Sequence, residues 1–330
     1  GISASEVSDY LDGSNPGIDW TDQMFRTGVT QNYKLVFSKG SEGTQTYVSA
    51  NYMGDEGVID KNSYERYSAK ANIKISMAKW LDVTVDLNAS HGVGKGIGGL
   101  EMSGYNPLWI AFNSSPTMTM TDKNGYYNWD PYGTIQANAY GIIAASESER
   151  RRDVFSGHID LKFNIIKGLT FTSSNGVDYY NNTSYSFTPQ SVNGAGKNSM
   201  GNSNLQRMLL QSSNNITYNH TWNDKHYLTV TGVWEATEST IRNMGISGSS
   251  LQAESVGWWD VKNAVTRDAT NGYSDWALLS GVGRVIYNYD NRYMLTGTFR
   301  ADGSSRFTND KWGYFPSVAV AWTASNESFM

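Results

Sequence analysis

Several residue types are scarce or absent, and each shortage excludes a class of protein. The 330 residues contain no cysteine, which excludes disulfides, thiolate metal sites and cysteine nucleophiles. No apolar run reaches the roughly 18 residues that a membrane helix needs. Proline occurs only 6 times, and charged residues make up 17%, against roughly 25% in an average domain. The net charge of −5 gives no reason to expect a nucleic-acid partner.

The clearest positive pattern lies in residues 67–91. Apolar and polar side chains alternate there along two arms, which are joined by a short link at 78–80. A period of two is typical of a β-strand. Arms of about 11 residues are longer than an ordinary strand and match a tilted transmembrane strand. The pattern predicts an all-β fold, a transmembrane antiparallel up-and-down β-barrel, with lipid outside and water inside.

The two faces of these arms receive different predictions. Four apolar residues near mid-membrane are expected to point outward into lipid: Ile73, Ile75, Val83 and Val85. Asp86 lies on the opposite face and is expected to point into a water-filled lumen.

Similar patterns elsewhere predict eleven strands, at 31–39, 44–54, 63–77, 81–91, 152–165, 169–180, 205–219, 225–240, 274–289, 292–302 and 312–324. Short links at 40–43, 78–80, 166–168, 220–224 and 290–291 alternate with longer ones at 55–62, 92–151, 181–204, 241–273 and 303–311. This alternation puts every short turn on one rim and every long loop on the other. Outer-membrane barrels have this asymmetry, with periplasmic turns and extracellular loops.

Aromatic residues gather near the rim that carries the short turns: Trp80, Phe163, Trp222, Tyr227, Tyr287, Tyr289 and Tyr293. They are expected to form an interfacial belt, although cross-strand pairs in any sheet would explain them too. Eleven strands is an odd number, whereas bacterial single-chain barrels have an even one. The predicted sheet is therefore expected to be a piece of a larger barrel.

Two stretches resemble one protein family. Residues 19–59 read DWTDQMFRTGVTQNYKLVFSKGSEGTQTYVSANYMGDEGVI, with a W-x-D-x-x-F segment followed by QNY at the start of a strand. Residues 293–330 contain RADGSSRF, then GYFPS, then AW. Both stretches resemble the SusC/RagA family of TonB-dependent outer-membrane transporters from Bacteroidetes. The turn Ser38-Lys39-Gly40 is a mild departure from the Ser-Gly-Gly of that family.

The resemblance implies a domain organisation. Family members have a signal peptide, a small regulatory-like domain, a TonB box and a plug domain, and then a barrel of about 22 strands. Residues 1–30 are accordingly expected to link plug and barrel, and residues 31–330 to form the first half of the barrel. The plug and the C-terminal half are expected to lie outside these residues.

The resemblance also implies a function and a set of partners. The expected function is active import of glycans or peptides across the outer membrane of a Gram-negative bacterium, with a SusD-like surface lipoprotein as lid. TonB would supply energy through the N-terminal region, and lipopolysaccharide and membrane lipids would surround the barrel. Transporter–lipoprotein pairs could form a dimer. A passive porin, or a secreted soluble carbohydrate-binding β protein, remains the alternative on pattern alone.

The candidate ligand- or partner-contacting residues are aromatics in two long loops: Trp109, Tyr126, Tyr127, Trp129, Trp258 and Trp259. Aromatic faces suit stacking on sugar rings, although the same residues could pack the loops. The run 149–153 reads as a solvated or snorkelling anchor, or as a contact for lipopolysaccharide phosphates or a partner protein. No catalytic constellation, cofactor fingerprint or metal-ligand spacing of the four histidines stands out, so no enzyme activity, cofactor or metal is expected.

Overall fold

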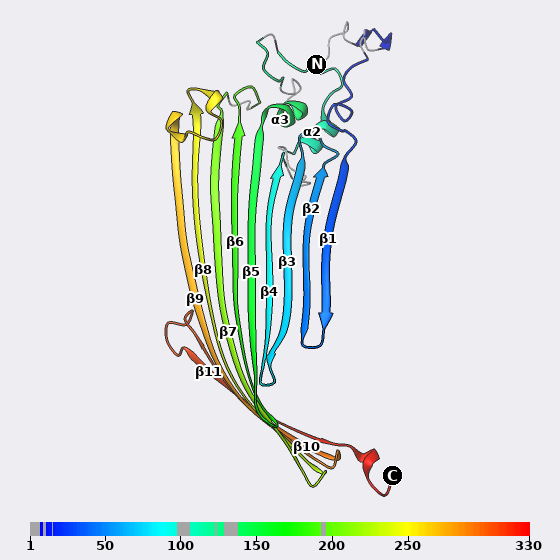
Figure 1. Ribbon diagram of the computed structural model, residues 1–330. Coiled ribbons are helices and arrows are strands. Elements are labelled where there is room, and N and C mark those ends of the chain that lie inside the picture. Colours follow the sequence, from blue (N-terminus) through cyan, green and yellow to red (C-terminus); the bar gives the residue numbers. More distant parts are fainter. Residues whose placement is uncertain are drawn as a thin grey trace.

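A single antiparallel sheet of eleven strands makes up most of the molecule, each strand pairing with the next along the chain (Figure 1). This computed structural model describes residues 7–8, 11–14, 16–97, 106–122, 124–128, 138–192 and 196–330. The sheet order runs from β1 to β11 without a crossover. The fold is therefore part of an up-and-down barrel, as the sequence predicted. Among the described residues, no helix is long and apolar enough to cross a membrane.

The strands fall into a short and a long group. The shorter ones are β1 (Val29–Ser41), β2 (Thr44–Glu56), β3 (Ser63–Ala78), β4 (Leu81–Lys95), β10 (Tyr293–Ser304) and β11 (Trp312–Trp322). The longer ones are β5 (Glu147–Ile166), β6 (Leu169–Thr188), β7 (Ser199–Trp222), β8 (His226–Leu251) and β9 (Ala264–Tyr289). All eleven predicted strands are confirmed. The long group exceeds the roughly 9–11 residues that a transmembrane strand needs.

Short and long connections alternate as predicted, but the long ones are shorter than expected. Only residues 189–198 join β6 to β7, and only 252–263 join β8 to β9. The predictions of loops at 181–204 and 241–273 were wrong at both ends of each range. The strands continue there with polar residues on both faces, so the apolar–polar alternation that marks a strand in sequence is absent.

The tight turns use residues that tolerate a left-handed backbone. Asp290 and Asn291 both have φ of 53°, the left-handed conformation of the two central residues of a type I′ turn, within the three-residue connection 290–292. Gly168, between β5 and β6, has φ of 82°, and a Cβ there would collide with the carbonyl oxygen of Asn219. Only glycine fits that turn. These turns set the register of the strands they join.

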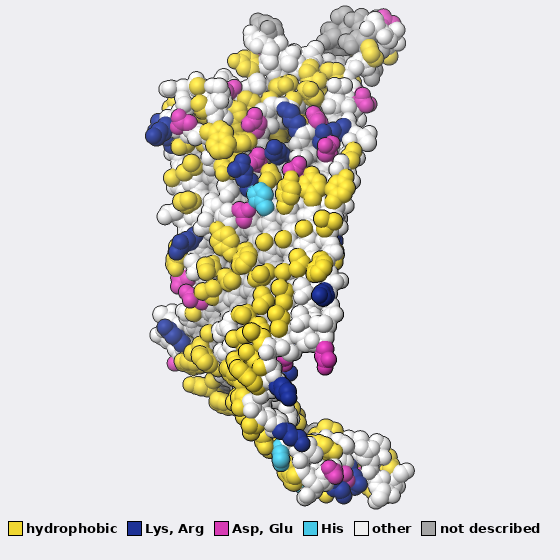
Figure 2. All heavy atoms as spheres, viewed as in Figure 1, with side chains coloured by type: hydrophobic (Ala, Val, Ile, Leu, Met, Phe, Trp, Pro, Cys, Tyr) yellow, Lys and Arg dark blue, Asp and Glu magenta, His cyan; other side chains and the backbone are white. Residues whose placement is uncertain are grey.

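The two faces of the sheet have opposite character. Val85 of β4 pairs with Ile73 of β3 and Ile159 of β5, so the three share a face. On the other face Asp86 lies between Asn72 and His158. Figure 2 shows hydrophobic side chains gathered over the middle and lower strands of one face, with charged side chains more frequent toward the upper end. We call the face that carries Val85 the apolar face and the face that carries Asp86 the polar face.

The height of the apolar band matches a membrane. On β3 it runs eleven residues, from Tyr67 to Met77, and so spans ten residue-to-residue steps. At about 3.3 Å per residue and a tilt of about 45°, this is about 23 Å, close to the ~25 Å band of outer-membrane barrels. At its upper edge Tyr33, Tyr52 and Tyr67 stand in a row, with ring centroids 6.2 and 5.1 Å apart.

The lower edge of the band carries the predicted aromatic belt. Trp80 stacks on Phe163 at 6.1 Å. Further along the rim, the ring of Trp222 stacks on His226 at 5.1 Å, and Tyr289 stacks on Tyr293 at 6.4 Å. One member was assigned wrongly. Tyr227 pairs with Asn288, which lies between the belt residues Tyr287 and Tyr289. Because successive side chains of a strand point to opposite faces, Asn288 and Tyr227 lie on the polar face.

One polar cluster interrupts the apolar band. Ser173 and Asn175 of β6 pair with Asn214 and Ser212 of β7 on the apolar face. Their side chains bond to one another: Asn175 donates to Ser173 at 3.0 Å, Ser212 to Asn175 at 2.8 Å and Asn214 to Ser212 at 3.2 Å. Polar side chains that have no water nearby need hydrogen-bond partners within the protein, and these four provide them for one another.

A small core lies above the sheet, at the long-loop rim. Helices α2 (Pro107–Asn113) and α3 (Ala139–Ala145) lie there at the upper end of the molecule (Figure 1). Trp20 and Met24 are buried against this loop region, and Trp20 Nε1 donates to the carbonyl of Ser115 at 2.9 Å. The segment before β1 therefore packs on the rim.

The two faces predict opposite responses to a positive charge. In the full-length protein, Val85→Arg should cost about 2–4 kcal/mol of folding free energy, because the charge would lie in lipid near mid-membrane. Asp86→Arg, on the polar face one residue away, should be tolerated. Folding into lipid vesicles, followed by the gel mobility of the unheated barrel, measures both. Equal damage at the two positions would contradict the assignment of the faces.

Candidate functional site

The polar face carries a hydrogen-bonded group at the middle of β5 and β6. Ser156 donates to Asp178, and its hydroxyl also lies 3.2 Å from Nε2 of His158. The imidazole of His158 lies 3.8 Å from Asp178. Its ring sits directly against Gly176, where a Cβ would be 2.5 Å from Nδ1 of His158. Glycine at this place in β6 therefore lets the imidazole lie flat on the wall.

A second charged group continues the polar face on β8, β9 and β10. The guanidinium of Arg300 donates to Asp302 at 2.8 Å and to Ser280 at 3.2 Å, and lies 3.8 Å from Glu235. Between the two groups is a cavity of about 290 Å³, lined by His158, Asp160, Glu235 and Ser280 among others. Carboxylates outnumber cations around it. The polar face can therefore accept hydrogen bonds from a hydrated or donor-rich molecule.

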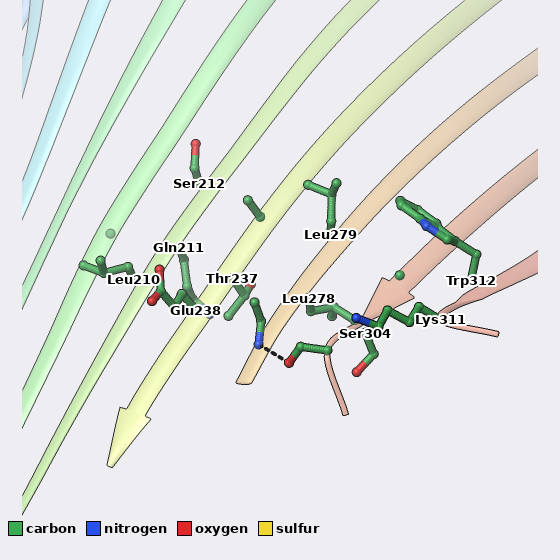
Figure 3. A pocket seen from close by; sticks show the side chains of 15 residues that line it. Leu210, Gln211, Ser212, Thr237, Glu238, Leu278, Leu279, Ser304, Lys311 and Trp312 are labelled. Atoms are coloured by element: carbon green, nitrogen blue, oxygen red, sulfur yellow. Dashed lines mark hydrogen bonds between the residues drawn. The ribbon is translucent and has the colours of Figure 1, made fainter. Parts of the chain in front are cut away.

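A larger hollow of about 560 Å³ lies where β9 stops pairing with β10 (Figure 3). Leu278 of β9 lies opposite Ser304, the last residue of β10. Just beyond, Ala277 N donates to Ser305 Oγ at 2.8 Å, drawn as the dashed line in Figure 3. Trp312 and Lys311 close the side formed by β11 and its preceding loop (Figure 3).

The tryptophan pair lies at the long-loop rim, on the apolar-face side of the sheet. Trp258 stacks on Tyr185 of β6 at 5.8 Å, and Trp259 contacts the same ring at 5.7 Å. Trp258 also packs against a buried cluster that includes Phe187. Trp259 is 69% exposed. Trp258 is therefore a packed residue, whereas most of the Trp259 side chain is open to a ligand or partner.

The other loop candidates also divide into packed and free residues. Trp109 on α2 and Tyr126 are 37% and 44% exposed. Tyr127 is half-buried against α3, with its ring 6.3 Å from that of Tyr140, and burial raises the pKa of its hydroxyl. Trp129 lies outside the described residues. Trp109, Tyr126 and Trp259 are therefore the candidates that a ligand or partner could reach.

The run 149–153 does not form one cationic patch. It belongs to β5, so its residues alternate between faces. Arg151 bonds Glu149 at 2.6 Å and lies over the Tyr185 ring at 5.3 Å. Arg152 lies over Tyr180, on the polar face. Arg151 therefore lies on the apolar face, and Arg150 and Arg152 lie on the polar face.

Asp153 of β5 lies at the upper edge of the apolar band, in register with His91 of β4 and Tyr67 of β3. His91 Nδ1 lies 2.6 Å from its carboxylate, and Asn181 donates to the other oxygen at 3.2 Å. The hydrogen bond with His91 lowers the pKa of the Asp153 carboxyl. A charged and hydrogen-bonded carboxylate belongs in water or at the interface rather than in hydrocarbon.

Comparisons with known proteins show what the chain is similar to. It is 27% identical over 320 residues to TonB-dependent receptor P3 of Formosa agariphila, covering 94% of this chain and 32% of that protein. It is also 27% identical over 340 residues to TonB-dependent receptor SusC of Bacteroides thetaiotaomicron, covering 94% and 33%. The chain is a homologue of TonB-dependent receptors, SusC among them. A scan against family models finds no match.

Solved structures agree on the fold. The RagAB peptide transporter superposes on the whole of this chain and on 40% of its own, with a TM-score of 0.75 at 20% identity. The chain spans about a third of the length of the TonB-dependent receptors it matches. These relatives are named as receptors and transporters, not enzymes.

The sequence did not point to several residues that the fold brings together. Tyr185, the ring that both tryptophans contact, was placed in a loop, since polar neighbours on both sides hid the strand. Glu235 and Arg300 meet from strands far apart in sequence. Asp302 was predicted only as the last residue of a strand, and the structure shows that it also accepts hydrogen bonds from Arg300. Local pattern carries no signal for such pairs.

The different environments of Trp258 and Trp259 yield a test in the full-length protein. If Trp259 contacts ligand or partner, Trp259→Ala should weaken that binding about twofold to tenfold while the barrel assembles normally, the size of one stacking contact. Trp258→Ala should instead loosen the 252–263 loop, seen as faster proteolysis there. Ligand affinity, partner co-purification and limited proteolysis measure the three readouts. Unchanged binding of both ligand and partner in Trp259→Ala would remove Trp259 from the site.

Proposed function

We propose that the chain forms the first half of the barrel wall of a SusC-like importer in the outer membrane of a Gram-negative bacterium. The observation that carries this proposal is the two-faced sheet. One face has an apolar band of membrane height with aromatic edges, and the other is polar along the same strands. The homology to TonB-dependent receptors supports active import over passive diffusion.

The domain roles are part of the same proposal. Residues 31–330 would supply half of the lumen wall, and residues 1–30 would link it to an upstream plug. Burial of Trp20 and Met24 at the long-loop rim supports a fixed path for the end of that linker. A plug held in the lumen would face the polar side chains around Arg300 and His158. TonB would displace it through the N-terminal region and so energise transport.

The cargo we propose is a glycan or a peptide too large for porins, captured with a SusD-like lipoprotein as lid. The RagAB structure is described as a peptide transporter, which supports a cargo of that size class. The exposed aromatics at the long-loop rim, Trp109, Tyr126 and Trp259, are suited to sugar or peptide contacts. Arg151, which lies over the Tyr185 ring, would meet lipopolysaccharide. Pairs of transporter and lipoprotein would assemble as a dimer.

Uptake of labelled oligosaccharides and oligopeptides by cells tests this function. Deleting the full-length receptor should abolish uptake of the cargo, and deleting TonB or collapsing the proton gradient should do the same in cells that keep the receptor. Energy is needed because the plug must be moved. A passive porin would keep taking up the cargo without TonB. The control is a small solute that enters through general porins, whose uptake should not change.

A further inference from the structure

The upper half of β9 is a bare sheet edge. β9 pairs with β8 along nearly its whole length, from Tyr289 to Ala264. It pairs with β10 only from Tyr289 to Leu278, because β10 ends at Ser304. The eleven residues 265–275 are all exposed. We call this segment the notch edge, because the neighbouring strand β10 stops at Ser304 and leaves a gap in the sheet beside it. Within the described residues nothing pairs with it.

The backbone groups that point out from the notch edge can be assigned. Ser305 N donates to the carbonyl of Ala277, and Ala277 N donates to Ser305 Oγ, so Ala277 directs both groups away from β8. Direction alternates along a strand, and the register with β8 is unbroken from Ala277 to Thr266. The N–H and C=O groups that face the notch therefore belong to the odd residues Arg267, Ala269, Asn271, Tyr273 and Asp275.

The notch edge is distinct from the open ends of the sheet. β1 and β11 are unpaired on their outer sides because the sheet is not closed. The notch arises between β9 and the hairpin that follows it directly, so it comes from the unequal lengths of neighbouring strands. Its floor is the hollow of Figure 3. Arg306 of the β10–β11 loop lies 5.7 Å from the ring of Trp276, the residue that follows the notch edge in β9.

The level of the notch edge relative to the membrane follows from the apolar face of β9. Val285 and Leu279 belong to the apolar band, and the polar Asp275 and exposed Tyr273 stand above it. Pairing with β10 thus ends where the band ends. An unpaired edge cannot lie in hydrocarbon, but above it water satisfies the groups. A long exposed edge of this kind is a template for another strand.

The direction of β9 and of its free backbone groups favours one of three molecules that could pair with the notch edge: a second copy of the chain, the cargo, or a lipid-anchored chain. Two copies in one membrane have parallel β9 strands, so they cannot form an antiparallel pair at this edge. Cargo on the barrel axis would meet the polar face, whereas the free groups lie in the plane of the wall. β9 descends from Ala264 at the rim toward the membrane, so an antiparallel partner strand must rise from the membrane surface. A chain anchored by an N-terminal lipid rises in that direction.

We propose that the notch edge docks the tether of the surface lipoprotein, the extended segment between its N-terminal lipid and its folded part, as an added antiparallel strand. This inference rests on the proposed function, which supplies the lipoprotein. Eleven residues at about 3.3 Å each give an edge of about 36 Å. Side chains of the tether would lie beside Tyr273 and Trp276 at the lower end and beside Arg267 and Asp268 at the upper end, so aromatic or β-branched residues suit the membrane-proximal half.

Site-resolved hydrogen exchange on the full-length receptor tests the docking. Three samples are compared in detergent: the receptor alone, its complex with the lipoprotein, and its complex with a lipoprotein that lacks the tether. The amides of the odd residues should exchange at least about tenfold more slowly in the intact complex only. The even amides, which bond to β8, should be protected in all three samples.

Two matched variants separate backbone pairing from side-chain contact. Asn271→Pro removes an N–H that faces the notch and leaves the β8 ladder intact, so it should weaken the complex about twofold to tenfold. Asn271→Ala keeps that N–H and should bind as the wild type does. Equal effects of the two variants would overturn the proposal.

The remaining outcomes distinguish a failure of the docking proposal from a failure of the proposed function. If the complex forms and the odd amides stay unprotected, or are protected without the tether, the docking is wrong and the proposed function stands. If they are already protected in the receptor alone, another segment of the receptor covers the edge and the docking is wrong. If no complex with a lipoprotein forms, the partner in the proposed function fails and the docking fails with it.

Discussion

Backbone hydrogen bonding is the constraint on which the rest of the structure depends. A strand that crosses a lipid layer has no water to satisfy its N–H and C=O groups, so each strand must lie beside another. Here that requirement is met by the simplest order, with every strand paired to the next from β1 to β11. Once the backbone is occupied in the plane of the sheet, side chains can point only to its two faces. The apolar band, the polar face and the notch edge all follow from this geometry.

The alternation of side chains made most of the fold predictable. β3 and β4 were predicted to within about four residues, because Ile73 and Val85 alternate with polar neighbours across the whole band. The upper ends of β6 to β9 were missed for the same physical reason. Above the band both faces meet water, so residues such as Asn204 and Arg242 stand where an apolar residue would have marked the strand. A strand without a buried face leaves little pattern in its sequence.

The candidate site was less predictable than the fold. Aromatic content identified the loops, but it could not tell Trp258, packed on Tyr185, from Trp259, which is 69% exposed. The polar group around Arg300 needed the sheet to bring Glu235 beside it from another strand. The resemblance of RADGSSRF to one family pointed to the right group of proteins, and homology to TonB-dependent receptors supports it. What such a motif cannot supply is which face each side chain occupies.

The central claim is that one face of this sheet meets lipid and the other meets water. Because the chain has no cysteine, single cysteines can be placed at each position from Asp82 to Asn88 of β4 without native thiols in these residues. In the full-length receptor in lipid vesicles, a water-soluble maleimide should label cysteines at the even positions and leave those at the odd positions unlabelled. Uniform labelling, or labelling of the odd positions alone, would contradict the account.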